Sequence, residues 1–151
     1  MIEIEIREGL SPNFDPGSLD AFIRKALELA EVSPESELSL VITDNAEIRQ
    51  LNREYLGADA PTDVLSFPLD FDNPETGSPY LGDIVISLPT AAQQAEAGGH
   101  ALIEEIKLLV VHGILHLLGH DHADPDEKAA MWQIQEQILT SLEVNARPTE
   151  S

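Results

Sequence analysis

Hydrophobic and polar residues alternate at two places in the first third of the chain. Residues 2–6 read IEIEI and residues 38–42 read LSLVI. A period of two residues is typical of strands that bury one face, so both segments are predicted strands. Between them, apolar residues at 19–30 recur three and four positions apart, which predicts an amphipathic helix with Ser18 as its N-terminal cap.

The middle of the chain continues with further strands and helices. Asp44 is the predicted cap of a helix that reaches Tyr55, and residues 64–67 predict a third strand of about four residues that ends before a proline. The segment 70–80 is rich in Asp, Pro and Gly and is predicted to be a surface loop. Residues 81–88 hold the densest run of β-branched side chains and predict a buried fourth strand.

Helices dominate the second half. Pro89 suits the first turn of a short helix that ends at a pair of glycines. A long apolar helix is predicted over residues 101–118, a last amphipathic helix begins at Asp124, and the tail from Asn145 is predicted to be frayed. Strands that lie mostly in the first half and helices that dominate the second predict an α+β fold with four strands and about five helices.

Composition limits the chemistry that this fold can hold. The chain has 151 residues, enough for one domain over residues 1–151 with a core of its own. It has no cysteine, which excludes disulfides, thiolate metal sites and cysteine nucleophiles. Metal ligands must therefore come from His, Asp and Glu.

The chain is strongly acidic, with 28 Asp and Glu against 8 Lys and Arg and a formal net charge of −20. A surface of this charge repels phosphate backbones and anionic lipids, which disfavours general affinity for nucleic acid. There is no basic leader with an apolar core, and the longest apolar run, residues 108–111, is too short to cross a bilayer. We therefore expect a cytoplasmic protein without a membrane partner.

Four of the five histidines lie in the string HGILHLLGHDH, residues 112–122. His112 and His116 are four residues apart on the predicted helix, so both rings project from one face. Gly119 permits the left-handed conformation that ends a helix, which allows His122 to return as a third ligand. The spacing predicts one Zn²⁺ ion per chain at the end of the long helix, with an open position for a water of pKa about 7.

The other polar residues near this string have alternative interpretations. His120 is offset from the ligand face and is predicted at the rim of the site, and Asp121 is either a turn former or a group that orients a ligand or acts as a base. These two are the candidate catalytic residues. His100 follows the glycine pair and is predicted at the surface. The alternative to metal binding is a histidine pair that is hydrogen-bonded within the core.

The His, His, Gly, His spacing is also that of the extended zinc-peptidase signature. That signature carries a glutamate directly after the first histidine as the general base, and Gly113 occupies this position here. Without the glutamate, peptide hydrolysis lacks the group that moves the proton of water to the leaving amine. The chain therefore keeps the metal ligands and lacks the peptidase base.

Three segments together resemble the YbeY family of rRNA-maturation endoribonucleases. They are the histidine string, DAPTDVLSFP at 59–68 and LGDIVIS at 81–87. With LNREYL at 51–56 included, the resemblance covers residues 41–122 in register and the whole chain more weakly. It implies a single YbeY-like metal-dependent hydrolase domain, an α+β fold with a small mixed four-stranded sheet.

The resemblance also implies a function and a set of site residues. Zinc would be held by His112, His116 and His122, and the activity would be a single-strand-specific endoribonuclease. Its setting would be 16S rRNA 3′-end maturation and ribosome quality control, with RNA and ribosomal components as partners. Ser66 and Asp83 would lie on strands beside the metal cleft and contact substrate, or else be a hydrogen-bonded strand serine and a capping carboxylate.

Two positions depart from the family pattern. Leu56 stands where family members commonly carry an arginine thought to contact phosphate. Arg53, one helical turn earlier, is the candidate replacement, and a helix-surface arginine is the alternative. His120 stands where a tyrosine is usual.

The same residues are also compatible with other classes of function. A zinc hydrolase of peptides or amides would use Asp121 or a strand carboxylate as its base. A non-catalytic metal-binding module would associate with ribosomes without cutting RNA, and a purely structural metal would make the fold melt on chelation. Nickel and copper accept imidazole as zinc does, so the identity of the metal is also open.

Overall fold

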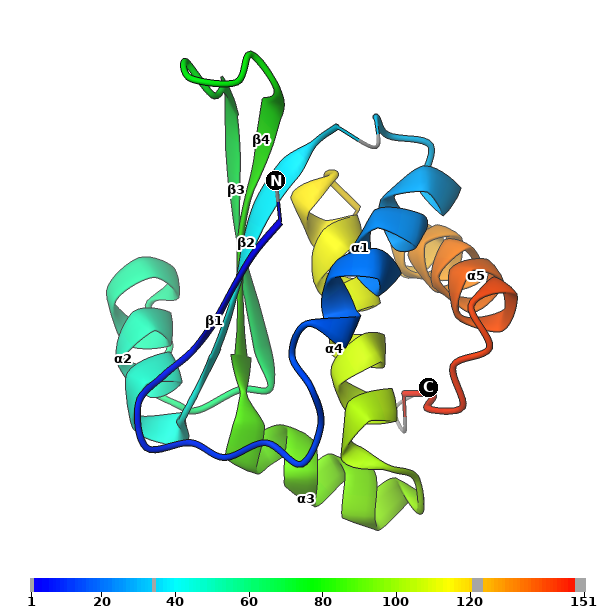
Figure 1. Ribbon diagram of the computed structural model, residues 1–151. Helices are drawn as coiled ribbons and strands as arrows, with labels where there is room; N and C mark the ends of the chain where they lie inside the picture. The colour runs from blue at the N-terminus through cyan, green and yellow to red at the C-terminus, as the bar shows by residue number, and fades with distance from the viewer. Residues whose placement is uncertain (1, 34, 121–123, 149–151) are drawn as a thin grey trace.

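The computed structural model describes residues 2–33, 35–120 and 124–148. Within these ranges the chain forms four strands and five helices (Figure 1). None of the described helices is both long and apolar enough to cross a membrane. The elements in chain order are β1 (Ile2–Ile6), α1 (Ser18–Leu29), β2 (Glu37–Thr43), α2 (Asn45–Leu56), β3 (Val64–Asp72), β4 (Pro79–Ser87), α3 (Leu88–Gly98), α4 (Leu102–Leu117) and α5 (Pro125–Ser141).

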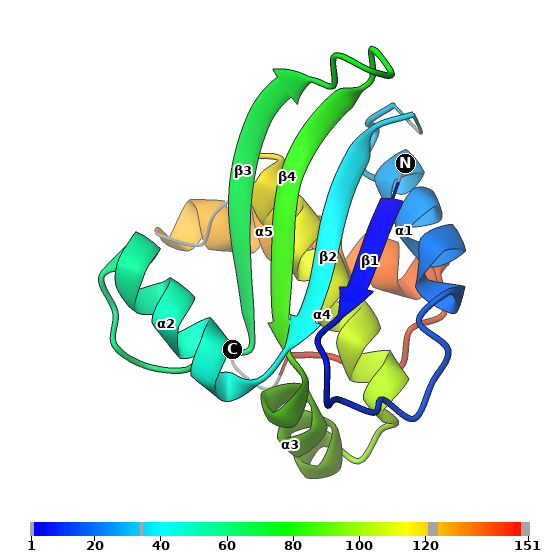
Figure 2. The same ribbon diagram turned by 60° about the vertical axis from the view of Figure 1, so that its left-hand side comes forward.

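The described strands form one mixed sheet in the order β1-β2-β4-β3. β1 and β4 both run parallel to β2, while β3 is antiparallel to β4. α1, α4 and α5 lie on one side of the sheet and α2 on the other, with α3 at the end where β4 stops (Figures 1 and 2). The predicted α+β fold with a small mixed four-stranded sheet is confirmed.

The central strands are apolar on both faces because both faces are covered. Leu40 and Ile84 are paired in register and are fully buried in the larger core, together with side chains of α1 and α4. Their neighbours Val41 and Val85 point to the opposite face and pack against Ile48 of α2. Strands buried on two sides lose the alternation that marks a half-exposed strand.

The loop predicted at residues 70–80 is shorter in the structure, where only residues 73–78 lie outside the strands. β3 has nine residues instead of about four, and it continues with β4 as a hairpin through the pairs Phe71 with Tyr80 and Asp72 with Pro79. The rings of Phe71 and Tyr80 stack with centroids 5.2 Å apart. β3 is an edge strand, so the missing N–H of Pro68 removes no bond that a second neighbour needs. Turn-forming residues were therefore compatible with a strand here.

One of the two predicted helix caps, Asp44, is confirmed, and the structure adds a cap at Asp124. Asp44 accepts a hydrogen bond from the N–H of Glu47 at 2.9 Å, and Asp124 accepts one from the N–H of Glu127 at 2.8 Å. The prediction for Ser18 is wrong, because α1 already begins at this residue and its hydroxyl donates back to the carbonyl of Asp15. The position before the helix is a glycine, which offers no side-chain acceptor.

The frayed tail predicted from Asn145 is also wrong as far as residue 148. Val144 and Ala146 are buried, and the N–H of Asn145 donates to Glu104 of α4 at 2.9 Å. Arg147 donates to the carbonyls of Val144 and Ala146 and pairs with Glu136 of α5 at 2.6 Å. The buried side chains of Val144 and Ala146 hold residues 144–148 against the helices. Arg147 and Pro148 of this segment line the groove described below.

An ion pair ties the end of β1 to α2. Nε of Arg7 lies 3.0 Å from Oε1 of Glu47, and Nη2 lies 3.1 Å from Oε2. The hydroxyl of Thr43 also donates to this carboxylate. The guanidinium of Arg7, followed by the Thr43 hydroxyl, lowers the pKa of Glu47 below its ordinary value of 4.5. A carboxyl group with a lowered folded-state pKa stabilises the fold above its unfolded pKa, and this contribution disappears as the pH falls through the folded pKa.

Glu47→Gln is therefore expected to lower the free energy of unfolding at pH 7, by up to about 1 kcal/mol because the pair is partly exposed. The difference from the wild type should shrink as the pH falls below 4.5. Urea unfolding at pH 7 and in acid measures both values. Glu54→Gln on the exposed side of the same helix is the control and should change the stability little. A deficit that persists undiminished in acid would contradict this assignment.

Candidate metal centre and the adjoining groove

α4 carries the histidines and ends at the predicted glycine. Gly119 has φ of +95°, in the left-handed region that glycine enters without strain. Its N–H donates to the carbonyl of His116, and the N–H of His120 donates to that of Leu115, each at 3.0 Å. These bonds satisfy carbonyls that the end of a helix leaves open. The predicted left-handed conformation of Gly119 at the end of the helix is confirmed.

His112 and His116 converge on one point beside α4. Their Nε2 atoms are 3.1 Å apart, and the rings meet edge to face at an interplanar angle of 72°. Two Zn–N bonds of about 2.0–2.1 Å at a tetrahedral angle place their nitrogens roughly 3.3 Å apart. The separation is close to that of two ligands of one zinc ion, and it is also that of a hydrogen bond between the two rings.

Gln135 of α5 orients one of these rings. Its Oε1 lies 2.9 Å from Nδ1 of His112, and the residue is only 2% exposed. An amide oxygen can only accept, so Nδ1 carries the hydrogen and Nε2 keeps its lone pair. This is the tautomer that binds a metal through Nε2, and such an outer partner commonly fixes the ring of a metal ligand.

The third predicted ligand, His122, and the candidate catalytic residue Asp121 lie outside the described residues. Within the described ranges, no group of three or more potential ligands is gathered. His120 is the last residue described before this gap, and its side chain is half-buried. The structure therefore brings two of the three predicted ligands together, and the complete zinc centre stays a prediction.

Ser66 is the predicted strand residue that lies beside α4. Its hydroxyl donates to the carbonyl of Gly113 at 3.1 Å, one residue after His112. This bond agrees with the alternative of a hydrogen-bonded strand serine. A Cβ atom at Gly113 would lie 2.9 Å from Cγ2 of Ile84 in β4. The position where peptidases carry their base is therefore a close contact between α4 and the sheet.

Asp83 and Arg53 are not brought together with the histidines. Asp83 pairs in register with Ser39 and lies on the face of the sheet opposite to Ile84 and α4. Its carboxylate accepts a bond from the hydroxyl of Tyr80, and burial together with this bond raises the pKa of Tyr80 to about 12. Arg53 is exposed on α2, which covers that same opposite face. The predicted substrate contacts therefore divide between two sides of the sheet.

A groove of about 510 Å³ opens beside His112. One wall comes from residues 61–63 before β3, from α3 and from α4, and the other from α5 and residues 147–148. Sequence analysis identified only His112 among its lining residues. The lining also includes Thr62, Asp63, Thr90, Gln94, Glu105, Lys128, Trp132, Gln135 and Arg147.

The surface position predicted for His100 is wrong. Its Nε2 lies 2.6 Å from Oε1 of Glu105, and the two side chains are 11% and 4% exposed. Gln94 donates to the other oxygen of Glu105 at 2.8 Å and to Asp63 at 3.3 Å. A buried carboxylate requires such donors, so the ring after the glycine pair is drawn inward. The network reaches from His100 to the wall of the groove.

Comparison of the sequence with known proteins shows which family the chain belongs to. The sequence profile described as Endoribonuclease YbeY matches residues 11–143. The chain belongs to the YbeY family. A YbeY endoribonuclease of Clavibacter michiganensis is 40% identical over 97% of this chain and 99% of its own length. The YbeY endoribonuclease of a Mycobacterium species is 41% identical over 91% of this chain and 81% of its own length. That of Rhodococcus opacus is 38% identical over 99% of this chain and 87% of its own length.

A solved structure shares the fold. TM1509 from Thermotoga maritima, determined in solution, superposes with a TM-score of 0.55 over 100% of both chains at 23% identity. At this identity the likeness concerns the fold alone. The mixed sheet and its helices are thus an arrangement found in a solved protein.

Gln135 is the YbeY-site residue that sequence reasoning missed. It follows Met131 by four residues and precedes Leu139 by four, so it occupies the buried face of α5 among apolar residues. A polar residue at such a position needs a hydrogen-bonding partner. A glutamine on the apolar face of the helix was therefore the available signal. Its partner, His112, depends on how α4 packs against α5.

Proposed function

We propose that this protein is a zinc-dependent endoribonuclease that cuts single-stranded RNA in the maturation of the 16S rRNA 3′ end and in ribosome quality control. Membership of the YbeY family supports the activity on RNA. The observation that carries the metal part is the pair of Nε2 atoms 3.1 Å apart, with the His112 tautomer set by Gln135.

In this proposal His112, His116 and His122 hold one Zn²⁺ ion per chain. When bound, such an ion supplies Lewis-acid polarisation of a phosphate oxygen. Imidazoles bind as neutral ligands and leave the charge of a cation undiminished, so a phosphate is attracted locally in spite of the net charge of −20. Gln135 fixes the orientation of the His112 ring. Asp121 and His120 are the candidates for moving the proton of the attacking hydroxyl.

The acidic surface bears on the partners. Isolated protein is expected to bind RNA weakly and in a salt-sensitive way, because most of its surface repels phosphates. A basic ribosomal component would offset this repulsion. We therefore propose cytoplasmic action on ribosomal particles, with rRNA precursor as substrate.

The test is cleavage by the purified chain. Zinc-loaded protein should cut unstructured RNA, leave duplex RNA and casein intact, and lose activity with a strong chelator. A strain that lacks the gene should accumulate 16S rRNA with an unprocessed 3′ end. Activity after complete removal of metal would contradict the metal part, and cleavage of casein would favour the peptidase alternative.

A second candidate is a non-catalytic metal-binding module that associates with ribosomes. Leu56, 60% exposed at the position where the family commonly has arginine, favours this alternative, since a phosphate-binding cation is absent there. It predicts co-sedimentation with ribosomes, no cleavage of RNA, and normal 16S processing in a strain that carries His112→Ala.

The role of Gln135 gives a separate prediction. Gln135→Leu, similar in volume but without an acceptor, should lower zinc affinity by about 10- to 100-fold. Gln135→Glu keeps an acceptor for Nδ1 of His112 and should retain the wild-type affinity or exceed it. Competition with a chelating dye measures both. Gln133→Leu on the exposed face of α5 is the control. Equal losses in Gln135→Leu and Gln135→Glu would indicate a packing role only.

A further inference from the structure

The two walls of the groove beside His112 differ in chemistry. On one wall Asp63, Gln94 and Glu105 form a chain of hydrogen bonds in which Gln94 donates to both carboxylates. Asp63 also accepts from the N–H of Val64 at 2.7 Å, so the carboxylate is held in place. This wall offers fixed acceptors to a ligand that carries hydroxyl or amino groups.

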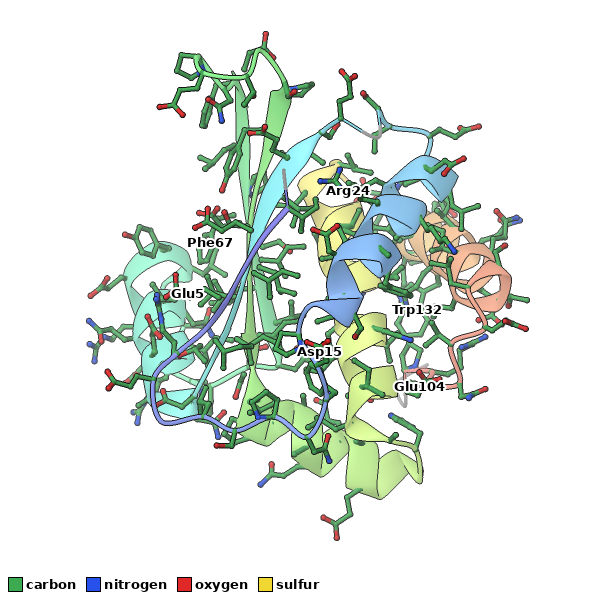
Figure 3. All side chains as sticks on the ribbon, in the orientation of Figure 1. Glu5, Asp15, Arg24, Phe67, Glu104 and Trp132 are labelled. Carbon is green, nitrogen blue, oxygen red and sulfur yellow. The ribbon has the colours of Figure 1, made fainter. Side chains whose placement is uncertain are left out.

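The opposite wall is aromatic and basic. Trp132, the only tryptophan of the chain, lies on α5 toward α4 (Figure 3), and the ammonium group of Lys128 lies 5.5 Å from its ring centroid. Arg147 lines the same wall. Two of the chain's eight basic residues thus border one groove in a molecule of net charge −20.

The indole of Trp132 is also incompletely bonded. Its Nε1 is buried and has no hydrogen-bond partner among the residues that the structure describes. A buried donor without an acceptor costs free energy comparable to a lost hydrogen bond. Trp132 thus combines an unused donor with a place in the lining of the groove.

We propose that this groove binds one nucleotide of single-stranded RNA next to the bond that is cut. The base lies against Trp132, the ribose hydroxyls and exocyclic groups face Asp63 and Gln94, and the phosphate lies toward Lys128. Unpaired bases are commonly recognised by stacking on aromatic rings with a nearby cation, and the 2′-hydroxyl distinguishes RNA from DNA. The proposal rests on the proposed endoribonuclease function and names the substrate subsite of the same site.

The volume and position of the groove agree with this occupant. A groove of about 510 Å³ is within the range of sites that hold drug-sized ligands. His112 lines the groove, so a nucleotide inside it would lie beside a candidate metal ligand. Lys128 provides a cation among the residues that line the groove.

The test uses the fluorescence of Trp132 in the full zinc-loaded chain. A ribonucleoside 3′-monophosphate, which has no phosphodiester bond to cut, should quench this fluorescence in a saturable way. The 2′-deoxynucleotide and the nucleoside without phosphate should bind several-fold more weakly. Inorganic phosphate and ribose 5-phosphate, which lack the base, should produce little quenching. Equal quenching by inorganic phosphate would overturn the nucleotide assignment, and stronger binding of a trilysine peptide would assign the groove to a basic protein instead.

Variants locate the binding within the groove. Lys128→Ala should weaken binding of the nucleotide by about tenfold and change binding of the nucleoside little, because the nucleoside has no phosphate to lose a charge-assisted bond. Lys25→Ala, which removes the same charge on the exposed side of α1, is the matched control. Trp132→Leu, followed by calorimetry, should weaken both ligands by about tenfold or more. Unchanged affinities in Lys128→Ala and Trp132→Leu would overturn the proposal.

These measurements are independent of catalysis. If RNA is cut but no nucleotide binds in the groove, the subsite is wrong and the proposed function stands. If nucleotides bind as expected but RNA is never cut, the function is wrong and the groove is a nucleotide site of a non-catalytic protein.

Discussion

His116→Ala is expected to abolish RNA cleavage, with a fall in rate of about a thousandfold or more. The substitution removes one of the two Nε2 atoms that converge at 3.1 Å, and a metal with one ligand fewer is lost or misplaced. Lewis-acid stabilisation contributes several kcal/mol to such reactions, which corresponds to a loss of this size. Initial rates on an unstructured RNA and the zinc content of the purified variant are the two measurements.

The control is the histidine that lies away from this centre. His100→Gln keeps a donor for Glu105 and should retain zinc, fold and cleavage within a few-fold. Circular dichroism should show that His116→Ala is folded, since the ring is partly exposed and its loss leaves the main core intact. If His116→Ala binds zinc as tightly as the wild type, the ligand assignment is wrong. Full cleavage without zinc would remove the metal from the reaction.

Gly82→Ala is expected to destabilise the fold by about 3 kcal/mol or more. Gly82 has φ of +141°, and a Cβ atom there would lie 2.3 Å from the carbonyl oxygen of Phe67 and 2.9 Å from Leu117 of α4. Backbone strain of this type costs about 1–3 kcal/mol, and forcing extra volume into a packed contact costs a similar amount. The position lies where β4 passes beneath α4, so neither neighbour can move freely.

Gly57→Ala separates the two contributions. Gly57 has φ of +75° at the end of α2, and a Cβ atom there meets nothing within 4 Å. The substitution should cost only about 1–2 kcal/mol, the price of a left-handed residue with a side chain. Urea unfolding of both variants at pH 7 gives the comparison. Equal losses would show that the close approach at Gly82 contributes nothing.

Most of the elements were predictable because their signals are local. Alternation at 2–6 and 38–42 and the cap Asp44 depend on neighbours within a few residues, and the structure confirms them. The β3–β4 hairpin was missed because its residues individually favour turns. Their strand conformation comes from pairing across the hairpin and from Asn73 and Thr76, which both donate to Glu37 at the start of β2.

The candidate site divides in the same way. The spacing of His112 and His116 follows from helix geometry and placed both rings correctly on one side of α4. Asp83 was expected beside the two histidines because its segment, residues 81–87, is part of the resemblance to the YbeY family. Successive residues of a strand, however, point to opposite faces of the sheet. Gly82 faces α4, so its neighbour Asp83 points away from α4. Contacts between α4 and α5, such as His112 with Gln135, depend on helix packing and have no local signal.

The chain order of the sheet has a consequence during translation. β2 is complete at Thr43, but its second neighbour β4 ends only at Ser87, 87 − 43 = 44 residues later. At about 5–20 residues per second, synthesis of this interval takes roughly 2–9 s. Throughout that time the edge of β2 that pairs with β4 has no partner, and α4, which packs on one face of β2, has not yet been made. Occupancy of this unfinished intermediate by a chaperone should therefore end once the hairpin and α4 emerge.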